Sequence, residues 1–197
     1  EIMVGLAPAT ALRVNFVGEL GWELHHGLEY QNHIFDALMH AGRDLGLKPF
    51  GIRAMDSLRV EKSYRLIGSE LSIEYAAYES GLERFVHPNK GDFIGRDALR
   101  VWRERGLENR FVTLEVHDVT DADALGNNPI YADGALVGRA TGGNYGFRVG
   151  KSLALAMVRP EHAAVGTELE MTILGTRHRV KVIPESPYDA ENQRLRA

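Results

Sequence analysis

The segment Phe16-Val-Gly-Glu-Leu-Gly-Trp-Glu23 decides how the first part of the chain is expected to fold. Apolar and polar residues alternate on both sides of it, which is typical of two β-strands, and its glycines indicate a tight turn between them. With Glu19-Leu20 as a two-residue loop, Phe16 lies directly opposite Glu23 in an antiparallel hairpin. Because side chains alternate between faces along a strand, both side chains then point to one side of the sheet.

An aromatic ring beside a carboxylate is a useful combination for binding. A carboxylate accepts two parallel hydrogen bonds from a flat N–C–NH2 edge, and a ring offers a stacking surface, so Phe16 and Glu23 together suit a pterin or a similar aminopyrimidine. The alternative is that Glu23 faces solvent, as a single glutamate on a strand usually does. The pattern alone leaves both interpretations open.

The residues that follow predict helices. Apolar residues recur at helical spacing from about Glu29 to Leu45, and Gly46 is the expected C-cap. Further helices are expected at about 52–62 and 96–105. The helix at 52–62 contains charged residues at spacings that allow ion pairs along one face, for which exposure to solvent is the commoner case: Arg53, Asp56, Arg59 and Glu61.

The second half of the chain has the pattern of an all-β domain. Short alternating runs follow one another, and Asp133-Gly134 is a strong signal for a two-residue hairpin turn. Short strands at this spacing favour a small barrel or sandwich. We therefore predict an α+β fold: an antiparallel sheet with packed helices in residues 1–107, a small all-β barrel in residues 108–190 and a polar tail in residues 191–197.

Composition excludes several classes of function. The 197 residues are 44% hydrophobic, enough for a substantial core, and carry a net charge of −4. This charge provides no basic surface of the kind that binds nucleic acid or anionic membranes, so we expect neither as a partner. No apolar run approaches the length of a membrane-spanning helix, and we expect a soluble chain. Cysteine is absent, and the eight histidines show no metal-binding spacing, so we expect neither disulfides nor a metal site.

The motifs assign no catalytic residue. Ser57, Ser63 and Ser152 lack the elbow motif that exposes a nucleophilic serine. Gly142-Gly143 does not begin a helical dinucleotide-binding fingerprint. We therefore predict no catalytic group in this chain from its residues alone.

The order and the sequences of five motifs resemble the folate-dependent aminomethyltransferases, the family of the glycine cleavage T-protein. The resemblance is greatest to the C-terminal region of the dimethylglycine and sarcosine dehydrogenases, which are flavoproteins, and it covers about residues 12–184. The motifs are Val17-Gly-Glu-Leu-Gly-Trp-Glu-Leu24, Arg53-Ala-Met-Asp-Ser-Leu-Arg-Val-Glu-Lys-Ser-Tyr64, Glu79-Ser-Gly-Leu82, Gly91-Asp-Phe-Ile-Gly-Arg-Asp-Ala-Leu99 and Gly142-Gly-Asn-Tyr-Gly-Phe-Arg-Val-Gly-Lys-Ser-Leu-Ala-Leu-Ala156.

The resemblance implies a tetrahydrofolate site that includes Glu23, Phe16, Met55 and Tyr145. Glu23 stands where the family has the glutamate that hydrogen-bonds the pterin. Phe16 stands where these proteins usually have tyrosine, so the ring is kept and the hydroxyl is lost. Met55 replaces an arginine with which T-proteins hold the folate tail, as in the dehydrogenase-like members. Tyr145 also matches that branch, in which it would form a wall of the site; the alternative is that it packs on the barrel core.

The resemblance also implies groups that this sequence does not contain. The family's catalytic aspartate and the FAD-binding domain of the dehydrogenases lie upstream of these motifs, so we expect the C-terminal part of a longer protein, inactive by itself. The implied parent protein oxidises a small N-methyl amine at the flavin and passes the one-carbon unit to folate, with the flavin domain attached in cis. The family occurs in the bacterial cytoplasm and in mitochondria; we expect the cytoplasm for a bacterial chain and the mitochondrion for a eukaryotic one.

Three functions remain open. The first is the folate-binding portion of a flavin-dependent N-methyl amine dehydrogenase. The second is a folate-dependent aminomethyltransferase, methyltransferase or demethylase without a flavin domain. The third is a non-catalytic module of the same fold. Met55 and Tyr145 favour the first function over the second, whereas Phe16 favours the third.

Overall fold

The computed structural model describes residues 1–119 and 121–197. These residues form two compact units, Glu1–Asp56 with Glu191–Ala197, and Ser57–Ala190. Among the described residues, none of the helices has the length and apolar content that crossing a membrane requires.

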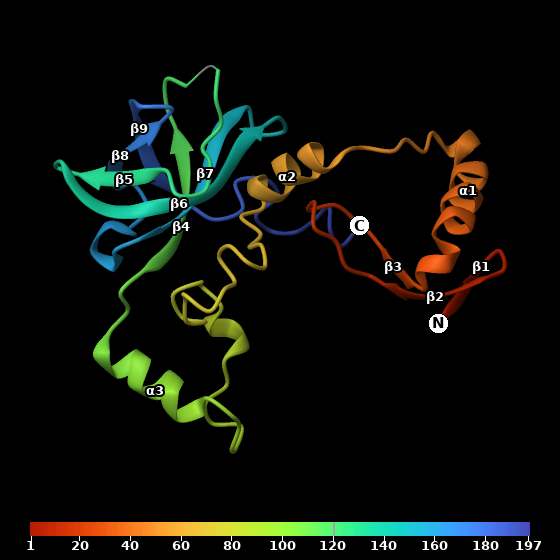
Figure 1. The fold of residues 1–197 in the computed structure, drawn as a ribbon, viewed down its shortest axis with the longest axis horizontal. Helices are drawn as coiled ribbons and strands as arrows, with labels where there is room; N and C mark the ends of the chain where they lie inside the picture. The colour runs from red at the N-terminus through yellow and green to blue at the C-terminus, as the bar shows by residue number, and fades with distance from the viewer. Residues whose placement is uncertain (120) are drawn as a thin grey trace. The chain divides into compact units, whose positions relative to one another are not determined.

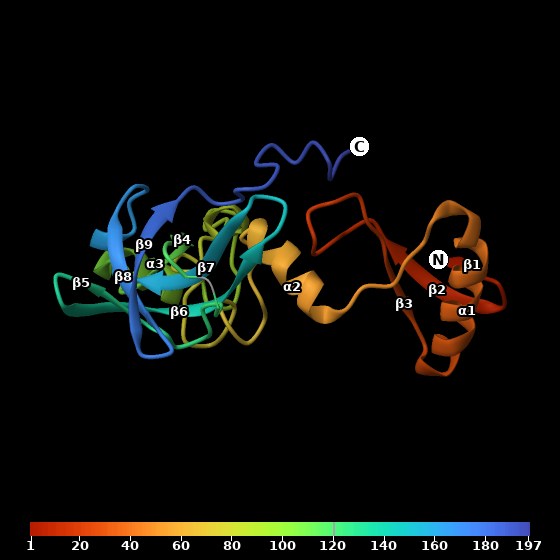
Figure 2. The same ribbon diagram turned by 90° about the horizontal axis from the view of Figure 1, so that it is seen from above.

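The first unit is a small antiparallel sheet with a helix beside it (Figure 2). Its strands are β1 (Ile2–Val4), β2 (Ala7–Leu12) and β3 (Glu23–His26), paired in the order β1-β2-β3. In β2, Ala7 and Ala9 are buried while Pro8 and Thr10 are exposed, because alternate side chains face opposite sides of the sheet. The backbone N–H of Leu6 donates to Nε2 of His33 at 3.0 Å, which ties the β1–β2 turn to helix α1 (Gln31–Ala41).

The helix predicted at 29–45 is confirmed in its centre and tightens into 3-10 turns at both ends. These turns are η1 (Leu28–Tyr30) and η2 (Arg43–Leu45). Gly46 caps η2 with a φ of 74°, a left-handed conformation that suits glycine and ends the helical segment as predicted.

The register predicted for the hairpin is wrong. Strand β2 ends at Leu12, and Leu12, not Phe16, pairs with Glu23. The side chain of Asn15 accepts hydrogen bonds from the backbone N–H groups of Val17 and Gly18, so the chain turns at residues 15–18 and Phe16 lies within the turn. Residues 13–22 therefore form a long loop rather than the end of a strand and a two-residue turn.

The second unit contains the predicted barrel (Figure 1). Its strands follow the order β4-β7-β6-β5-β8-β9, and β9 pairs with β4 to close the ring. The Asp133-Gly134 turn has positive φ values of 49° and 79°, as the favoured two-residue hairpin turn requires. The strands are β4 (Arg110–Val116), β5 (Pro129–Ala132), β6 (Ala135–Gly146), β7 (Lys151–Val158), β8 (Glu168–Ile173) and β9 (Thr176–Ile183), with η4 (Pro160–His162) between β7 and β8.

The barrel core consists of apolar side chains at alternate positions along these strands. Those with no exposed surface include Leu114, Ala154, Ala156, Val158, Ile130 and Met171. Burial of these side chains supplies the main driving force for folding of the barrel, and the alternation that predicted the strands is the same pattern that fills this core.

The segment before the barrel carries α2 (Ile52–Glu61), η3 (Glu83–Phe85) and α3 (Arg96–Arg105). The predicted limits of α3 are confirmed. Buried Glu79 joins this segment to the start of the barrel: its Oε1 accepts hydrogen bonds from the backbone N–H groups of Glu108 and Asn109, at 3.1 and 2.9 Å. This segment and the barrel belong to one compact unit, Ser57–Ala190. The division of the chain into domains 1–107 and 108–190 stays a prediction.

Candidate functional site

Glu23 begins strand β3 with its side chain half exposed. Nε2 of His25, on the same face of the strand, lies 3.2 Å from Oε2 of Glu23. Among the residues that the structure describes, this is the only hydrogen bond to the Glu23 carboxylate. The carboxylate therefore keeps most of its acceptor capacity for an external donor.

A hollow of about 710 Å³ lies against the same sheet. Residues of β1, β2 and β3 line it, His25 and His26 among them. His25 both lines this hollow and contacts Glu23, whereas Glu23 is not itself one of the lining residues.

The structure does not bring the other predicted residues to Glu23 through strand pairing. Phe16 is half buried in the 13–22 loop, outside the ladder. Met55 is half buried on α2, in the first unit, and Tyr145 lies near the end of β6, in the second unit. The predicted pairing of Phe16 with Glu23 across a hairpin is thus replaced by a pairing of Glu23 with Leu12.

Tyr145 is held by its backbone and presents its ring outward. Its carbonyl accepts a hydrogen bond of 2.6 Å from Oγ of Ser57, on α2, and it pairs with Ser152 of β7. The ring is 42% exposed and meets the ring of Phe147 edge-on, with centroids 5.0 Å apart. The ring of Tyr145 is therefore accessible to a ligand.

The charged face expected on α2 is exposed at Arg53 but buried in the last turn of the helix. Arg59 and Glu61 are buried, and Lys62, directly after the helix, is buried as well. Glu61 has no exposed surface and accepts hydrogen bonds from the backbone N–H of Arg148, at 2.7 Å, and from its Nε. The prediction of a solvated face is thus wrong for Arg59 and Glu61: Arg59 donates to the carbonyl of Tyr64 at 2.7 Å, and Glu61 accepts from Arg148, in the turn after β6.

The same buried charges hold the segment after the barrel. Nζ of Lys62 donates to the carbonyls of Tyr188 and Asp189 at 3.1 and 2.8 Å. The guanidinium of Arg148 stacks on the ring of Tyr188 at 3.6 Å, and the backbone N–H of Tyr188 donates to the carbonyl of Glu61 at 3.1 Å. The role of this cluster is structural, and the motifs that contain Glu61, Lys62 and Arg148 do not indicate that these residues meet.

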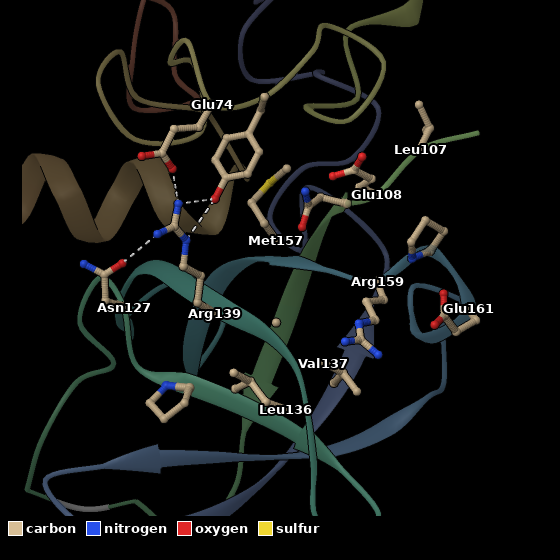
Figure 3. Close-up of a pocket in the computed structure, with 15 residues that line it drawn as sticks. Glu74, Leu107, Glu108, Asn127, Leu136, Val137, Arg139, Met157, Arg159 and Glu161 are labelled. Atoms are coloured by element: carbon tan, nitrogen blue, oxygen red, sulfur yellow. Dashed lines mark hydrogen bonds and ion pairs between the residues drawn. The ribbon is translucent and has the colours of Figure 1, made fainter. Parts of the chain in front are cut away.

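A further pocket, of about 820 Å³, lies outside the barrel beside Arg139 (Figure 3). The Arg139 guanidinium donates to the hydroxyl of Tyr75 at 2.7 and 3.0 Å and to Oδ1 of Asn127 at 3.3 Å, and it forms an ion pair with Glu74. The hydrogen bond with Tyr75 raises the pKa of the Arg139 guanidinium further above its usual value. Arg139 thus forms part of the pocket wall, and the sequence patterns did not identify it.

Two family models match the two parts of the chain. The GCVT N-terminal domain matches residues 1–90, and the glycine cleavage T-protein C-terminal barrel domain matches residues 109–189. The chain belongs to the glycine cleavage T-protein family. The second match spans strands β4 to β9, so the closed ring is the barrel domain of this family.

Relatives of this chain include a dehydrogenase and an aminomethyltransferase. Mitochondrial dimethylglycine dehydrogenase of Homo sapiens is 40% identical over 94% of this chain and 21% of its own length. An aminomethyltransferase of Symbiobacterium thermophilum is 36% identical over 95% of this chain and 50% of its own length. The chain therefore spans between a fifth and a half of the length of these relatives.

A solved structure shows the same fold. Glycine cleavage system aminomethyltransferase T from Bartonella henselae superposes with a TM-score of 0.81 at 21% identity, covering 91% of this chain and 49% of that one. The predicted α+β fold with a terminal barrel is confirmed.

Proposed function

We propose that this chain is the tetrahydrofolate-binding portion of a flavin-dependent N-methyl amine dehydrogenase. The observation that carries the proposal is the 40% identity to dimethylglycine dehydrogenase across 94% of the chain. That relative, by its name, oxidises an amine with N-methyl groups, and the chain corresponds to only 21% of it. The redox step then belongs to residues outside these 197, and the share of this chain is to bind the one-carbon acceptor.

The residues at the sheet of the first unit fit a reduced folate. The pterin ring presents a flat N–C–NH2 edge, and Glu23 offers a half-exposed carboxylate whose only described partner is His25. The adjacent hollow of about 710 Å³ is large enough for a bicyclic ring. Phe16, Met55 and Tyr145 are proposed as the further walls of the site. Bound tetrahydrofolate supplies the nitrogen atoms that take up the one-carbon unit.

The alternative is a folate-dependent aminomethyltransferase without a flavin domain. It is favoured by the Symbiobacterium relative, of which this chain covers half at 36% identity. Met55 separates the two proposals, because an arginine at this position would strengthen the contact with the anionic folate tail. In the complete protein, a bound flavin that the amine reduces would favour the dehydrogenase, and aminomethyl transfer without flavin would favour the transferase.

Glu23→Gln in the complete protein tests the folate site. Glutamine keeps one acceptor and turns the other oxygen into a donor that faces the N–H groups of the ligand, so we expect a loss of roughly 1.5–3 kcal/mol, or about ten- to a hundredfold in tetrahydrofolate affinity. Reduction of the flavin by the amine, measured anaerobically, should be unchanged. Glu168→Gln is a matched control, since Glu168 is an exposed glutamate that begins strand β8. Unchanged folate affinity in Glu23→Gln would show that Glu23 is an ordinary strand glutamate.

A further inference from the structure

The pocket beside Arg139 lies entirely within the second unit and has an apolar wall. Its volume of about 820 Å³ falls in the range of about 300–1,000 Å³ that is typical of small-molecule sites. Met157 and Val137 line it and are buried, and Leu136, beside them, is 57% exposed. In Figure 3 Met157 lies between Arg139 and Arg159. Such a wall favours a ligand with an apolar body, because binding then removes two apolar surfaces from water.

Most of the charged side chains around this pocket already have partners. The guanidinium of Arg139 is paired with Glu74, and Glu108 forms an ion pair with an arginine of α3. Arg159 and Glu161 differ from these residues: within the described part of the chain, their side chains form neither a hydrogen bond nor an ion pair, with each other or with a third residue. Both are exposed. One cation and one anion at the pocket are therefore available to a ligand.

The backbone that carries these two side chains is fixed. The backbone N–H of Arg159 donates to the carbonyl of Val137 at 2.9 Å, and the carbonyl of Arg159 accepts from the backbone N–H of His162 at 2.9 Å. Pro160, between the two charged residues, begins η4 and restricts its own φ. The cation and the anion are thus held two residues apart at one edge of the pocket.

The charges around the pocket select a ligand that carries both signs. The lining contains three carboxylates against two guanidiniums, so a simple anion such as phosphate meets net repulsion although Arg159 is available. A zwitterion has a partner for each of its charges. Its carboxylate accepts hydrogen bonds from the planar guanidinium of Arg159, and its ammonium donates to the carboxylate of Glu161.

We propose that this pocket binds an apolar α-amino acid. Arg159 binds its carboxylate, Glu161 binds its ammonium, and its side chain packs on Met157 and Leu136. All four residues belong to the second unit, and none of them belongs to the folate site proposed above. The test of this pocket is therefore independent of the proposed function.

Three ligands test the proposal on the 197-residue chain. L-Leucine carries both charges, 4-methylpentanoate is leucine without the ammonium, and 3-methylbutylamine is leucine without the carboxylate. Titration of the ¹⁵N-labelled chain, followed by NMR, should show saturable shifts around residues 136–139 and 157–162 with leucine. Because the two charged partners are exposed, we expect each of the other two ligands to bind about two- to fivefold more weakly.

Two substitutions assign the charges of the ligand. Arg159→Gln should weaken leucine and 4-methylpentanoate by about two- to fivefold and leave 3-methylbutylamine unchanged, whereas Glu161→Gln should weaken leucine and the amine and leave the acid unchanged. Arg179→Gln is the matched control, since Arg179 is an exposed arginine of β9 outside the pocket, and it should change none of the three affinities.

Two results with the unsubstituted chain would overturn the proposal. The first is that leucine causes no saturable shifts, or causes them only at residues outside the pocket. The second is that leucine and 4-methylpentanoate bind equally well, which would show that the ammonium has no partner. An Arg159→Gln chain that binds leucine as tightly as the unsubstituted chain would overturn the role of Arg159.

Discussion

Arg148 donates to Glu61 from both its main chain and its side chain. The backbone N–H lies 2.7 Å from Oε1 of Glu61, and Nε donates to Oε2. Since Glu61 is at the C-terminal end of α2 and Arg148 is in the turn after β6, one buried carboxylate joins the helix to the barrel. This contact also supports the backbone between Tyr145 and Arg148.

Loss of this carboxylate should destabilise the second unit strongly. Glu61→Gln removes the negative charge of a carboxylate that has no exposed surface and that pairs with the Arg148 guanidinium, whose side chain is 19% exposed, and breaking a buried pair in this way costs about 3–5 kcal/mol. Urea denaturation followed by circular dichroism measures the change. Glu170→Gln removes one partner of the exposed pair with Arg177 and should cost less than about 1 kcal/mol. Equal losses in the two variants would contradict the role assigned to Glu61.

Glu79 should keep the backbone at residues 108 and 109, just before strand β4, in a fixed conformation. Its Oε1 accepts the backbone N–H groups of Glu108 and Asn109, and its Oε2 accepts that of Ala76 at 3.0 Å. Glu79→Gln replaces one acceptor with a donor, so we expect a loss of about 1.5–3 kcal/mol and faster amide exchange at residues 108 and 109. Glu104→Gln, on the exposed side of α3, should leave exchange unchanged; protection that persists in Glu79→Gln would refute the prediction.

The pH dependence of stability should contain an alkaline contribution from Tyr64. Burial is the main cause that raises the pKa of its hydroxyl above the usual value of 10.0; Arg84 opposes the rise and Asp189 adds to it. The folded state then holds the proton more tightly than the unfolded state, so this contribution is constant below pH 10.0 and falls as the pH rises from there toward the folded pKa. Denaturation at pH 9 and at about pH 11 should show a smaller alkaline loss in Tyr64→Phe than in the parent chain. Equal losses would count against a raised pKa.

Limited proteolysis should distinguish two ways of dividing the chain. Phe50 is 63% exposed in the irregular stretch before α2, whereas Trp102 and Leu107 are half buried. Chymotrypsin is therefore expected to cut after Phe50 before it cuts after Trp102 or Leu107, which separates the units on either side of residues 56 and 57. First cleavage after Trp102 or Leu107 would instead support the domain boundary predicted near Leu107. Mass spectrometry of the first products decides between them.

The sequence predicted the parts of the fold that local patterns determine. Alternation of apolar and polar residues predicted the barrel strands, Asp133-Gly134 predicted the turn after Ala132, and Gly46 predicted the end of the first helical segment. Each of these features depends on neighbouring residues only. The register of the first hairpin could not be predicted in this way. It depends on whether Asn15 caps a turn or continues a strand, and both are compatible with the same alternation.

The burial of the charged residues around α2 could not be predicted from the sequence, for a different reason. The residues around α2 look like an exposed charged face in the sequence, and the partners of Glu61 and Lys62 come from Arg148 and Tyr188, far along the chain. For the candidate site, the motifs identify Glu23 as a carboxylate on a strand, which the structure confirms. Its contact with His25 comes from the placement of both residues on one face of the strand.

Closure of the barrel should affect how the two parts of the chain aggregate. Each of its strands is paired on both sides, whereas in the sheet of the first unit β1 and β3 are paired on one side only among the described residues. Unpaired N–H and C=O groups along an edge strand are a template for further strand addition between molecules. Expressed as separate pieces, residues 1–56 should therefore form intermolecular β-aggregates at concentrations at which residues 57–190 stay dispersed.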